Sequence, residues 1–110
     1  MISYIVSCHN RPKELLCCLA SLRLQESPRE ILVCDNSSDG HYRDQCRAVC
    51  TVGIGGIQYL DTWRGKESDI CYHSPEYLGA TGDWLCFPSD DSYYVPMFSK
   101  IMLAAAAWNS

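Results

Sequence analysis

The chain has 110 residues, which limits it to a single domain. Hydrophobic residues make up 47% and charged residues 20%, a composition that can form a core and excludes a disordered polar tail. The net charge is −4 and the lysines and arginines form no cluster, so we do not expect nucleic acid as a partner.

Apolar runs alternate with helical patterns along the whole chain. In chain order, the sequence predicts a strand over 2–6, a helix from Pro12, a strand over 31–34, a helix over 42–49, a strand over 57–60, a partly helical segment over 66–79, a strand over 84–87 and a helix over 97–108. Short strands separated by helices favour an α/β fold, with a mostly parallel sheet and helices on both faces.

Local signals support these elements. Pro12 suits the first turn of a helix, and leucines at 15, 16, 19 and 22 recur at helical spacing as one apolar face. The sequence DNSSDG at 35–40 consists of turn-forming residues. The sequence GIGG at 53–56 lacks the spacing of a phosphate-binding loop, so we interpret it as a flexible turn.

Eight cysteines could form a disulfide framework or act as reduced core residues. Most of them lie in apolar runs such as LLCCLASL and ILVCD, where a thiol behaves as a small apolar side chain. The sequence MISYIVSCHN lacks the basic start and the long apolar run of a signal peptide. We therefore expect a reduced, cytoplasmic protein.

Three polar clusters follow predicted strands, at residues 7–11, 35–39 and 89–92. In a parallel sheet the carboxyl ends of the strands share one edge, where ligands bind near the reversal of strand order. Each cluster alone is more simply explained as a solvated loop. Together they predict a binding site at that edge.

Two of these polar residues are adjacent carboxylates, Asp90 and Asp91. They would repel each other unless a positive charge lies near them, and Mg²⁺ or Mn²⁺ bound to substrate phosphates would supply that charge. The alternative is that they only stabilise the dipole of the helix that begins about five residues later.

The other two clusters also allow two interpretations. His9 could stack on a base or donate to a phosphate, or be an ordinary surface histidine. Asp35 could accept a hydrogen bond from a base or a ribose, or only shape its own turn. Arg11 could neutralise a phosphate, or pair with Glu14 on the surface.

Three segments at consistent spacing carry a family resemblance. They are ISYIVSCHNRPKELLCCLASL, EILVCDNSSDG and LGATGDWLCFPSDDSYYVP, and together they span nearly the whole chain. They resemble the N-terminal, nucleotide-sugar-binding half of the family 2 glycosyltransferases, which have the Rossmann-like GT-A fold.

The resemblance implies a role for each polar cluster. Asp91 is expected to bind Mn²⁺ or Mg²⁺ on the diphosphate of the donor, and Asp90 to lie near the ribose. The nucleotide-sugar site is then expected to comprise Ser7, His9, Asn10, Arg11, Asp35, Asn36 and Asp90.

The implied reaction is inverting transfer of a sugar from a nucleotide diphosphate to an acceptor hydroxyl. The acceptor-binding half and the general base are expected beyond Ser110, so residues 1–110 are expected to be one incomplete domain. The apolar C-terminal helix is expected to meet that missing half, a homodimer partner, or the inner face of a membrane. The alternatives are a non-catalytic nucleotide- or metal-binding module and a plain α/β interaction domain.

Overall fold

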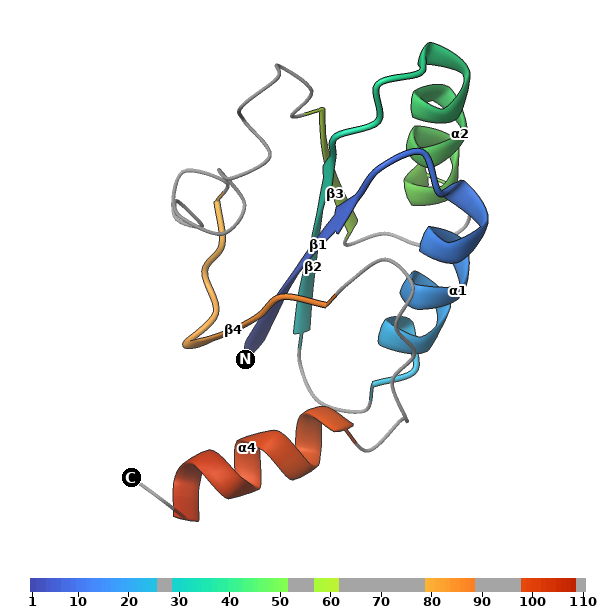
Figure 1. The fold of residues 1–110 in the computed structure, drawn as a ribbon. Helices are drawn as coiled ribbons and strands as arrows, with labels where there is room; N and C mark the ends of the chain where they lie inside the picture. Colours follow the sequence, from blue (N-terminus) through green and yellow to red (C-terminus); the bar gives the residue numbers. More distant parts are fainter. Residues whose placement is uncertain (26–28, 52–56, 62–78, 89–97, 109–110) are drawn as a thin grey trace.

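The structure is a computed structural model that describes residues 1–25, 29–51, 57–61, 79–88 and 98–108 (Figure 1). Four strands and three helices lie in these ranges, in the predicted order. They are β1 (Ile2–Cys8), α1 (Pro12–Arg23), β2 (Arg29–Asp35), α2 (Gly40–Thr51), β3 (Ile57–Asp61), β4 (Trp84–Cys86) and α4 (Phe98–Trp108).

The four strands form one parallel sheet in the order β3-β2-β1-β4, which confirms the predicted α/β class. The chain steps from β1 to β2 to β3 in one direction and returns to place β4 on the other side of β1. The strand order therefore reverses between β1 and β4. Cys8, Asp35 and Asp61 are at the carboxyl ends of β1, β2 and β3, and these ends meet at one edge.

Helix α1 begins at Pro12, as predicted, because proline has no N–H to lose at the first helical position. Its buried residues are Leu15, Cys18, Leu19 and Leu22. The prediction that Leu16 belongs to the apolar face was wrong, since its side chain is 49% exposed. Cys18 takes its place, because it is three positions from Leu15 and four from Leu22, and so shares their face.

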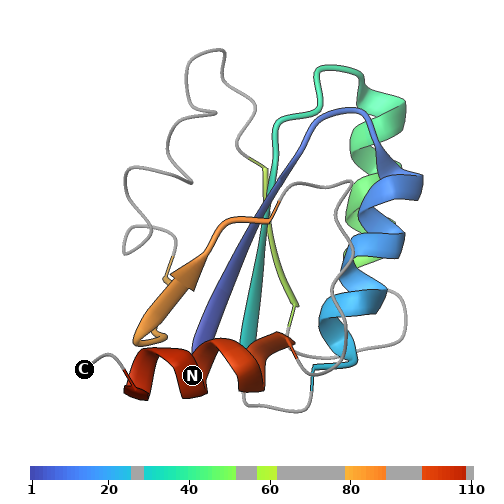
Figure 2. The same ribbon diagram turned by 60° about the horizontal axis from the view of Figure 1, so that its bottom comes forward.

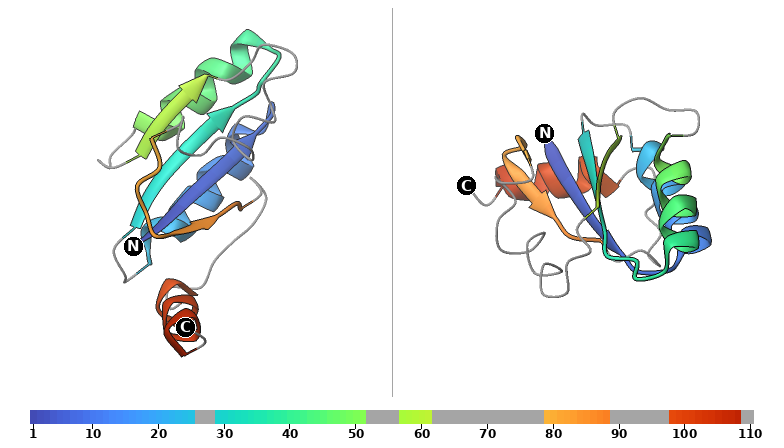
Figure 3. Two further views of the ribbon diagram at one scale, coloured as in Figure 1. Left: turned by 90° about the vertical axis from the view of Figure 1, so that its left-hand side faces the viewer. Right: turned by 90° about the horizontal axis from the view of Figure 1, so that it is seen from above.

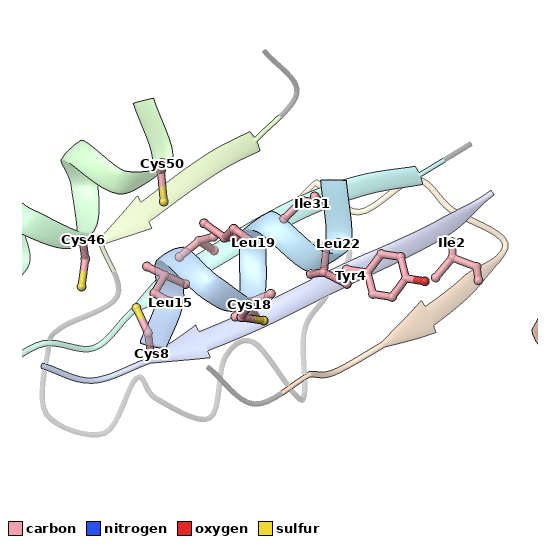
Figure 4. Packing of buried hydrophobic residues seen from close by; sticks show 12 residues of the cluster. Ile2, Tyr4, Cys8, Leu15, Cys18, Leu19, Leu22, Ile31, Cys46 and Cys50 are labelled. Carbon is pink, nitrogen blue, oxygen red and sulfur yellow. The ribbon is translucent and has the colours of Figure 1, made fainter. Parts of the chain in front are cut away.

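Helices α1 and α2 lie together on one side of the sheet, as the right-hand view of Figure 3 shows. The main core lies between them and alternate residues of β1 and β2, and it runs from Ile2 and Tyr4 at one end to Cys8 and Cys46 at the other (Figure 4). On the opposite face, Ile5, Leu32 and Cys34 form a smaller cluster. Most of the predicted helical segment 66–79, and the turn at 53–56, lie outside the described residues.

Most of the cysteines that the structure describes are buried in the core as free thiols. All seven that the structure describes are free thiols, and five of them are buried: Cys8, Cys18, Cys34, Cys46 and Cys50. Burial raises the pKa of Cys50 to about 12, which keeps this thiol protonated at neutral pH.

Helix α4 lies beside the amino end of β1 (Figure 2). Its first turn is anchored: the side chains of Ser99 and Tyr4 share a hydrogen bond, and the Ser99 N–H donates to Oε1 of Gln25 at 2.8 Å. Farther along, Ile101 is 57% and Met102 48% exposed. No helix within the described ranges is long and apolar enough to cross a membrane.

Candidate functional site

The loops that follow β1 and β2 are joined at the carboxyl edge of the sheet. The N–H of Asn36 donates to the carbonyl of Cys8 at 2.9 Å, and Nδ1–H of His9 donates to the carbonyl of Asn36 at 2.6 Å. Because a carbonyl can only accept, Nδ1 of His9 carries the proton of this hydrogen bond. The predicted polar clusters at 7–11 and 35–39 are thus hydrogen-bonded to each other.

Asn10 makes several of these loop-to-loop contacts. Its N–H donates to Oγ of Ser37 at 2.9 Å, and its side-chain amide donates to Oγ of Ser38 at 3.1 Å. Its Oδ1 accepts from the N–H of Asp39 at 3.3 Å. Asn10 also has a φ of 54°, in the left-handed region that asparagine tolerates better than most residues. These hydrogen bonds therefore hold the loop after β1 against the loop after β2.

Asp39 caps helix α2, a role that the sequence analysis missed. Its Oδ1 accepts from the N–H groups of His41 at 2.8 Å and Tyr42 at 3.3 Å. The signal was present, since aspartate directly before a helical pattern is a favoured N-cap. The cap fixes where α2 begins, and with it the position of Cys46 near the carboxyl edge of the sheet.

Asp35 is fully buried, and protein donors engage both of its carboxylate oxygens. Oδ1 accepts from the N–H of Ser37 at 2.9 Å and lies 3.6 Å from the thiol of Cys8. Oδ2 accepts from the hydroxyl of Tyr59 at 2.5 Å. The Ser37 bond is the turn-forming interaction that the sequence allowed as an alternative role for Asp35.

Two thiols lie beside the Asp35 carboxylate and titrate differently. A hydrogen bond with Cys46, burial and the negative charge of Asp35 all raise the pKa of Cys8. The hydrogen bond with Cys8 and another with the Ser37 hydroxyl lower the pKa of Cys46, although burial opposes this. Of the two, Cys46 is the thiol that deprotonates more readily.

Tyr59 of β3 is a second residue that the sequence analysis missed. Burial and the adjacent Asp35 carboxylate raise the pKa of its hydroxyl, so Tyr59 stays a hydrogen-bond donor at neutral pH. The guanidinium of Arg47 lies 5.3 Å from the centre of its ring. Nothing in the sequence pairs Tyr59 with Asp35, because the contact depends on the β2–β3 register.

The remaining predicted residues lie in different places. Ser7 is half-buried, and because side chains alternate along β1 it faces the side of the sheet opposite to Cys8 and Asp35. Arg11 is exposed at the N-cap of α1. Asp90 and Asp91 lie outside the described residues, so the predicted metal ligands are not placed.

A comparison with protein families shows which family the chain belongs to. The family model for glycosyl transferase family 2 matches residues 3–68, which is more than half of the sequence. The chain belongs to glycosyl transferase family 2. The matched range contains β1 except its first residue, all of β2 and β3, and the bonded loops at their carboxyl edge. No curated protein matches the chain.

Solved structures agree with this membership at the level of fold. The crystal structure of S. aureus TarS 1–349 is 23% identical to this family 2 chain, with a TM-score of 0.66, and the match covers 97% of this chain and 32% of TarS 1–349. The complex of TarS 1–349 with UDP-GlcNAc gives a TM-score of 0.65, with 97% of this chain and 31% of that one covered at 23% identity. The chain thus spans about a third of that relative and has the Rossmann-like GT-A fold.

Proposed function

We propose that the chain is the donor-binding part of a family 2 glycosyltransferase and that the carboxyl edge of its sheet holds a nucleotide-diphosphate sugar. The observation that carries the proposal is the bonded pair of loops after β1 and β2, within the region that the family model matches. These loops present the exposed His9 and Arg11 and the half-buried Asn10. An imidazole ring, a guanidinium and an amide can bind a base, phosphates and hydroxyls.

Asn36 and Asp35 contribute to this site mainly by shaping it. The carbonyl of Asn36 orients His9, and Asp35 fixes the turn that brings Ser37 to Asn10. Ser7, on the other face of β1, would reach a ligand only near the order reversal between β1 and β4. Direct nucleotide contact by Ser7, Asp35 and Asn36 remains part of the proposal.

Asp90 and Asp91 suit the divalent cation that this family implies, because paired carboxylates are hard oxygen donors that match Mg²⁺ or Mn²⁺. Cys86 pairs with Tyr4 in the sheet. Asp90 comes four positions after Cys86, just as Cys8 comes four positions after Tyr4. A chain of that length is enough to reach the carboxyl edge. When bound, the ion would neutralise charge on the diphosphate leaving group.

The reaction we propose is inverting transfer of the sugar to an acceptor hydroxyl. A general base must remove the proton of that hydroxyl, and we expect the base and the acceptor site beyond Ser110. The chain spans only about a third of TarS 1–349, so the full activity is proposed for the longer protein. The complexes of TarS with UDP-GlcNAc and UDP make a uridine diphosphate the first ligand to test.

We also propose a cellular compartment for the protein. The described cysteines are free, which is typical of a reducing compartment, so we propose a cytoplasmic protein. Ile101 and Met102 of α4 are exposed, and an apolar groove of about 460 Å³ lies between this helix and β4. We propose that this apolar surface contacts the rest of the protein, a second copy, or the inner face of a membrane.

Calorimetric titration with UDP, GDP and dTDP, with and without Mn²⁺, tests the donor site. We expect one diphosphate to bind only with Mn²⁺, and Asp91→Ala to abolish that binding. Asp83→Asn is a matched control, because this aspartate lies at the opposite edge of the sheet, 3.5 Å from the N-terminal amine. Unchanged metal-dependent binding in Asp91→Ala would refute the assigned metal ligand.

A further inference from the structure

A compact group of three metal-binding side chains lies beneath the carboxyl edge. The sulfurs of Cys8 and Cys46 and a carboxylate oxygen of Asp35 all lie within 4.8 Å of one another. They come from the ends of β1 and β2 and from α2, and Figure 4 shows the two cysteines at the same end of the core. All three residues are buried, so the group is distinct from an exposed acidic patch.

The spacing within this group suits a tetrahedral zinc ion. Zinc–sulfur and zinc–oxygen bonds of about 2.3 and 2.0 Å, at the tetrahedral angle, hold the two ligand atoms about 3.5 Å apart. The sulfur of Cys8 lies 3.6 Å from Oδ1 of Asp35. The hydroxyl oxygen of Ser37, which accepts from the N–H of Asn10, lies 3.9 Å from the sulfur of Cys46. The Cys8–Asp35 separation therefore already matches that of two zinc ligands, and the sulfur of Cys46 lies within 4.8 Å of the Cys8 sulfur and of a carboxylate oxygen of Asp35.

The charges also favour a thiophilic cation. When Zn²⁺ binds, two S–H bonds break, two zinc–sulfur bonds form, and two protons pass to solvent. The two positive charges of the ion balance the two thiolates. The site then keeps only the single negative charge that the buried Asp35 carboxylate already has, so binding adds no net charge to the core.

Groups around the carboxylate hold it in place for such an ion. The hydroxyl of Tyr59 donates to Oδ2 of Asp35, and the N–H of Ser37 donates to Oδ1. Hydrogen bonds of this kind orient metal-binding carboxylates and increase metal affinity. Oδ2 is thus fixed by Tyr59, which leaves Oδ1 facing the sulfur of Cys8.

We propose that Cys8, Asp35 and Cys46 form a zinc site that ties β1, β2 and α2 together below the nucleotide edge. Thiolate ligands select Zn²⁺ over Mg²⁺ and Mn²⁺, which separates this site from the one proposed at Asp90 and Asp91. The ion would link the end of β1, which leads directly into His9, to Asp35 at the end of β2. Its role is structural, and the proposal does not depend on nucleotide binding.

Cobalt is a spectroscopic probe for this site. The chain is unfolded in denaturant with a chelator, freed of both, and refolded with Co²⁺, because buried ions are often acquired during folding. We expect one Co²⁺ per chain, a thiolate-to-cobalt charge-transfer band, and loss of the band when Zn²⁺ is added. Cys8→Ser and Cys46→Ser should each lower Zn²⁺ affinity about 100-fold or more.

Two other cysteines are matched controls. Cys17 is exposed on α1, and Cys50 is buried on α2 one turn beyond Cys46, yet neither belongs to the group. Cys17→Ser and Cys50→Ala should keep the cobalt band. A folded wild-type chain without the band would overturn the proposal, and so would a band that persists in Cys46→Ser or disappears in Cys17→Ser.

A measurement on the unmodified chain covers the case in which Cys46→Ser does not fold. Zn²⁺ should slow alkylation of Cys8 and Cys46 by N-ethylmaleimide, as located by peptide mass spectrometry, and leave the alkylation rate of the exposed Cys17 unchanged. Equal rates at Cys8 and Cys46 with and without Zn²⁺ would overturn the site. Neither experiment contains a nucleotide, so a failed donor site would not affect the result.

Discussion

The hydroxyl of Tyr59 on β3 donates a 2.5 Å hydrogen bond to Oδ2 of Asp35 on β2. This contact connects neighbouring strands at the edge where the loops after β1 and β2 meet. Because Asp35 is fully buried, its charge depends on such donors for compensation. The position of Asp35, and the turn that it shapes, therefore depend on a residue 24 positions away in the sequence.

Removing the Tyr59 hydroxyl should destabilise the fold. In Tyr59→Phe, Oδ2 of the buried Asp35 loses the hydrogen bond from Tyr59, and a hydrogen bond to a charged group contributes about 1.5–3 kcal/mol. The free energy of unfolding from urea titration measures the loss. Tyr42→Phe is the control, because Tyr42 is 41% exposed on α2 and should tolerate the change. Equal stability of the two variants would show that the Tyr59–Asp35 bond contributes little.

Glu30 should make stability depend on pH. Burial opposes its ionisation, but hydrogen bonds from Ser3, Thr81 and Gly82 outweigh burial and lower the pKa of Glu30 below its ordinary 4.5. A carboxylate with a lowered folded-state pKa stabilises the fold above its ordinary pKa, and that contribution is lost as pH falls through the lowered value. Glu30→Gln should therefore be about 1–2 kcal/mol less stable at neutral pH.

Below pH 4.5 the stabilities of wild type and Glu30→Gln should converge as the wild-type carboxylate becomes protonated. Urea unfolding at a series of pH values measures this. Glu14→Gln, at an exposed position in the first turn of α1, is the control and should show no comparable convergence. A constant difference between Glu30→Gln and wild type across this range would contradict the assigned cause.

Gly82 should not tolerate a side chain. A Cβ at this position would lie 2.5 Å from Oγ of Ser3, 2.8 Å from the Ser3 nitrogen and 2.9 Å from the Met1 carbonyl. Gly82→Ala must therefore displace backbone beside the β1–β4 pairing, at a cost of about 1–3 kcal/mol. Gly40→Ala is the control, since its nearest contact would be Arg43 at 3.8 Å. Thermal unfolding of both variants compares them, and a similar Tm would contradict the predicted clash.

The strands and helices were predictable because their signals are local. The apolar run before Cys8, Pro12 at the start of α1 and the turn sequence after Asp35 each report on their own neighbourhood. Leu16 shows the limit of such signals. Helical spacing alone predicts that Leu16 belongs to the apolar face. The position of the sheet determines that Cys18 is buried and that Leu16 is exposed.

The candidate site was predictable only in part, because its contacts join distant segments. Parallel strands ending in polar residues indicated that His9, Asn10 and Asp35 gather at one edge, and the structure confirms that they do. The burial of Asp35 under Tyr59 depends on strand register and helix packing. Side-chain contacts between elements are not encoded in the spacing of either element alone.

The central claim, a metal-dependent donor site at the carboxyl edge, is tested most directly by titrating the folded chain with UDP in the presence and absence of Mn²⁺. The account predicts saturable, Mn²⁺-dependent binding of one nucleoside diphosphate per chain, with GDP and dTDP titrated in turn if UDP does not bind. Binding that does not depend on Mn²⁺, or the absence of binding to UDP, GDP and dTDP in a chain shown to be folded, would contradict it.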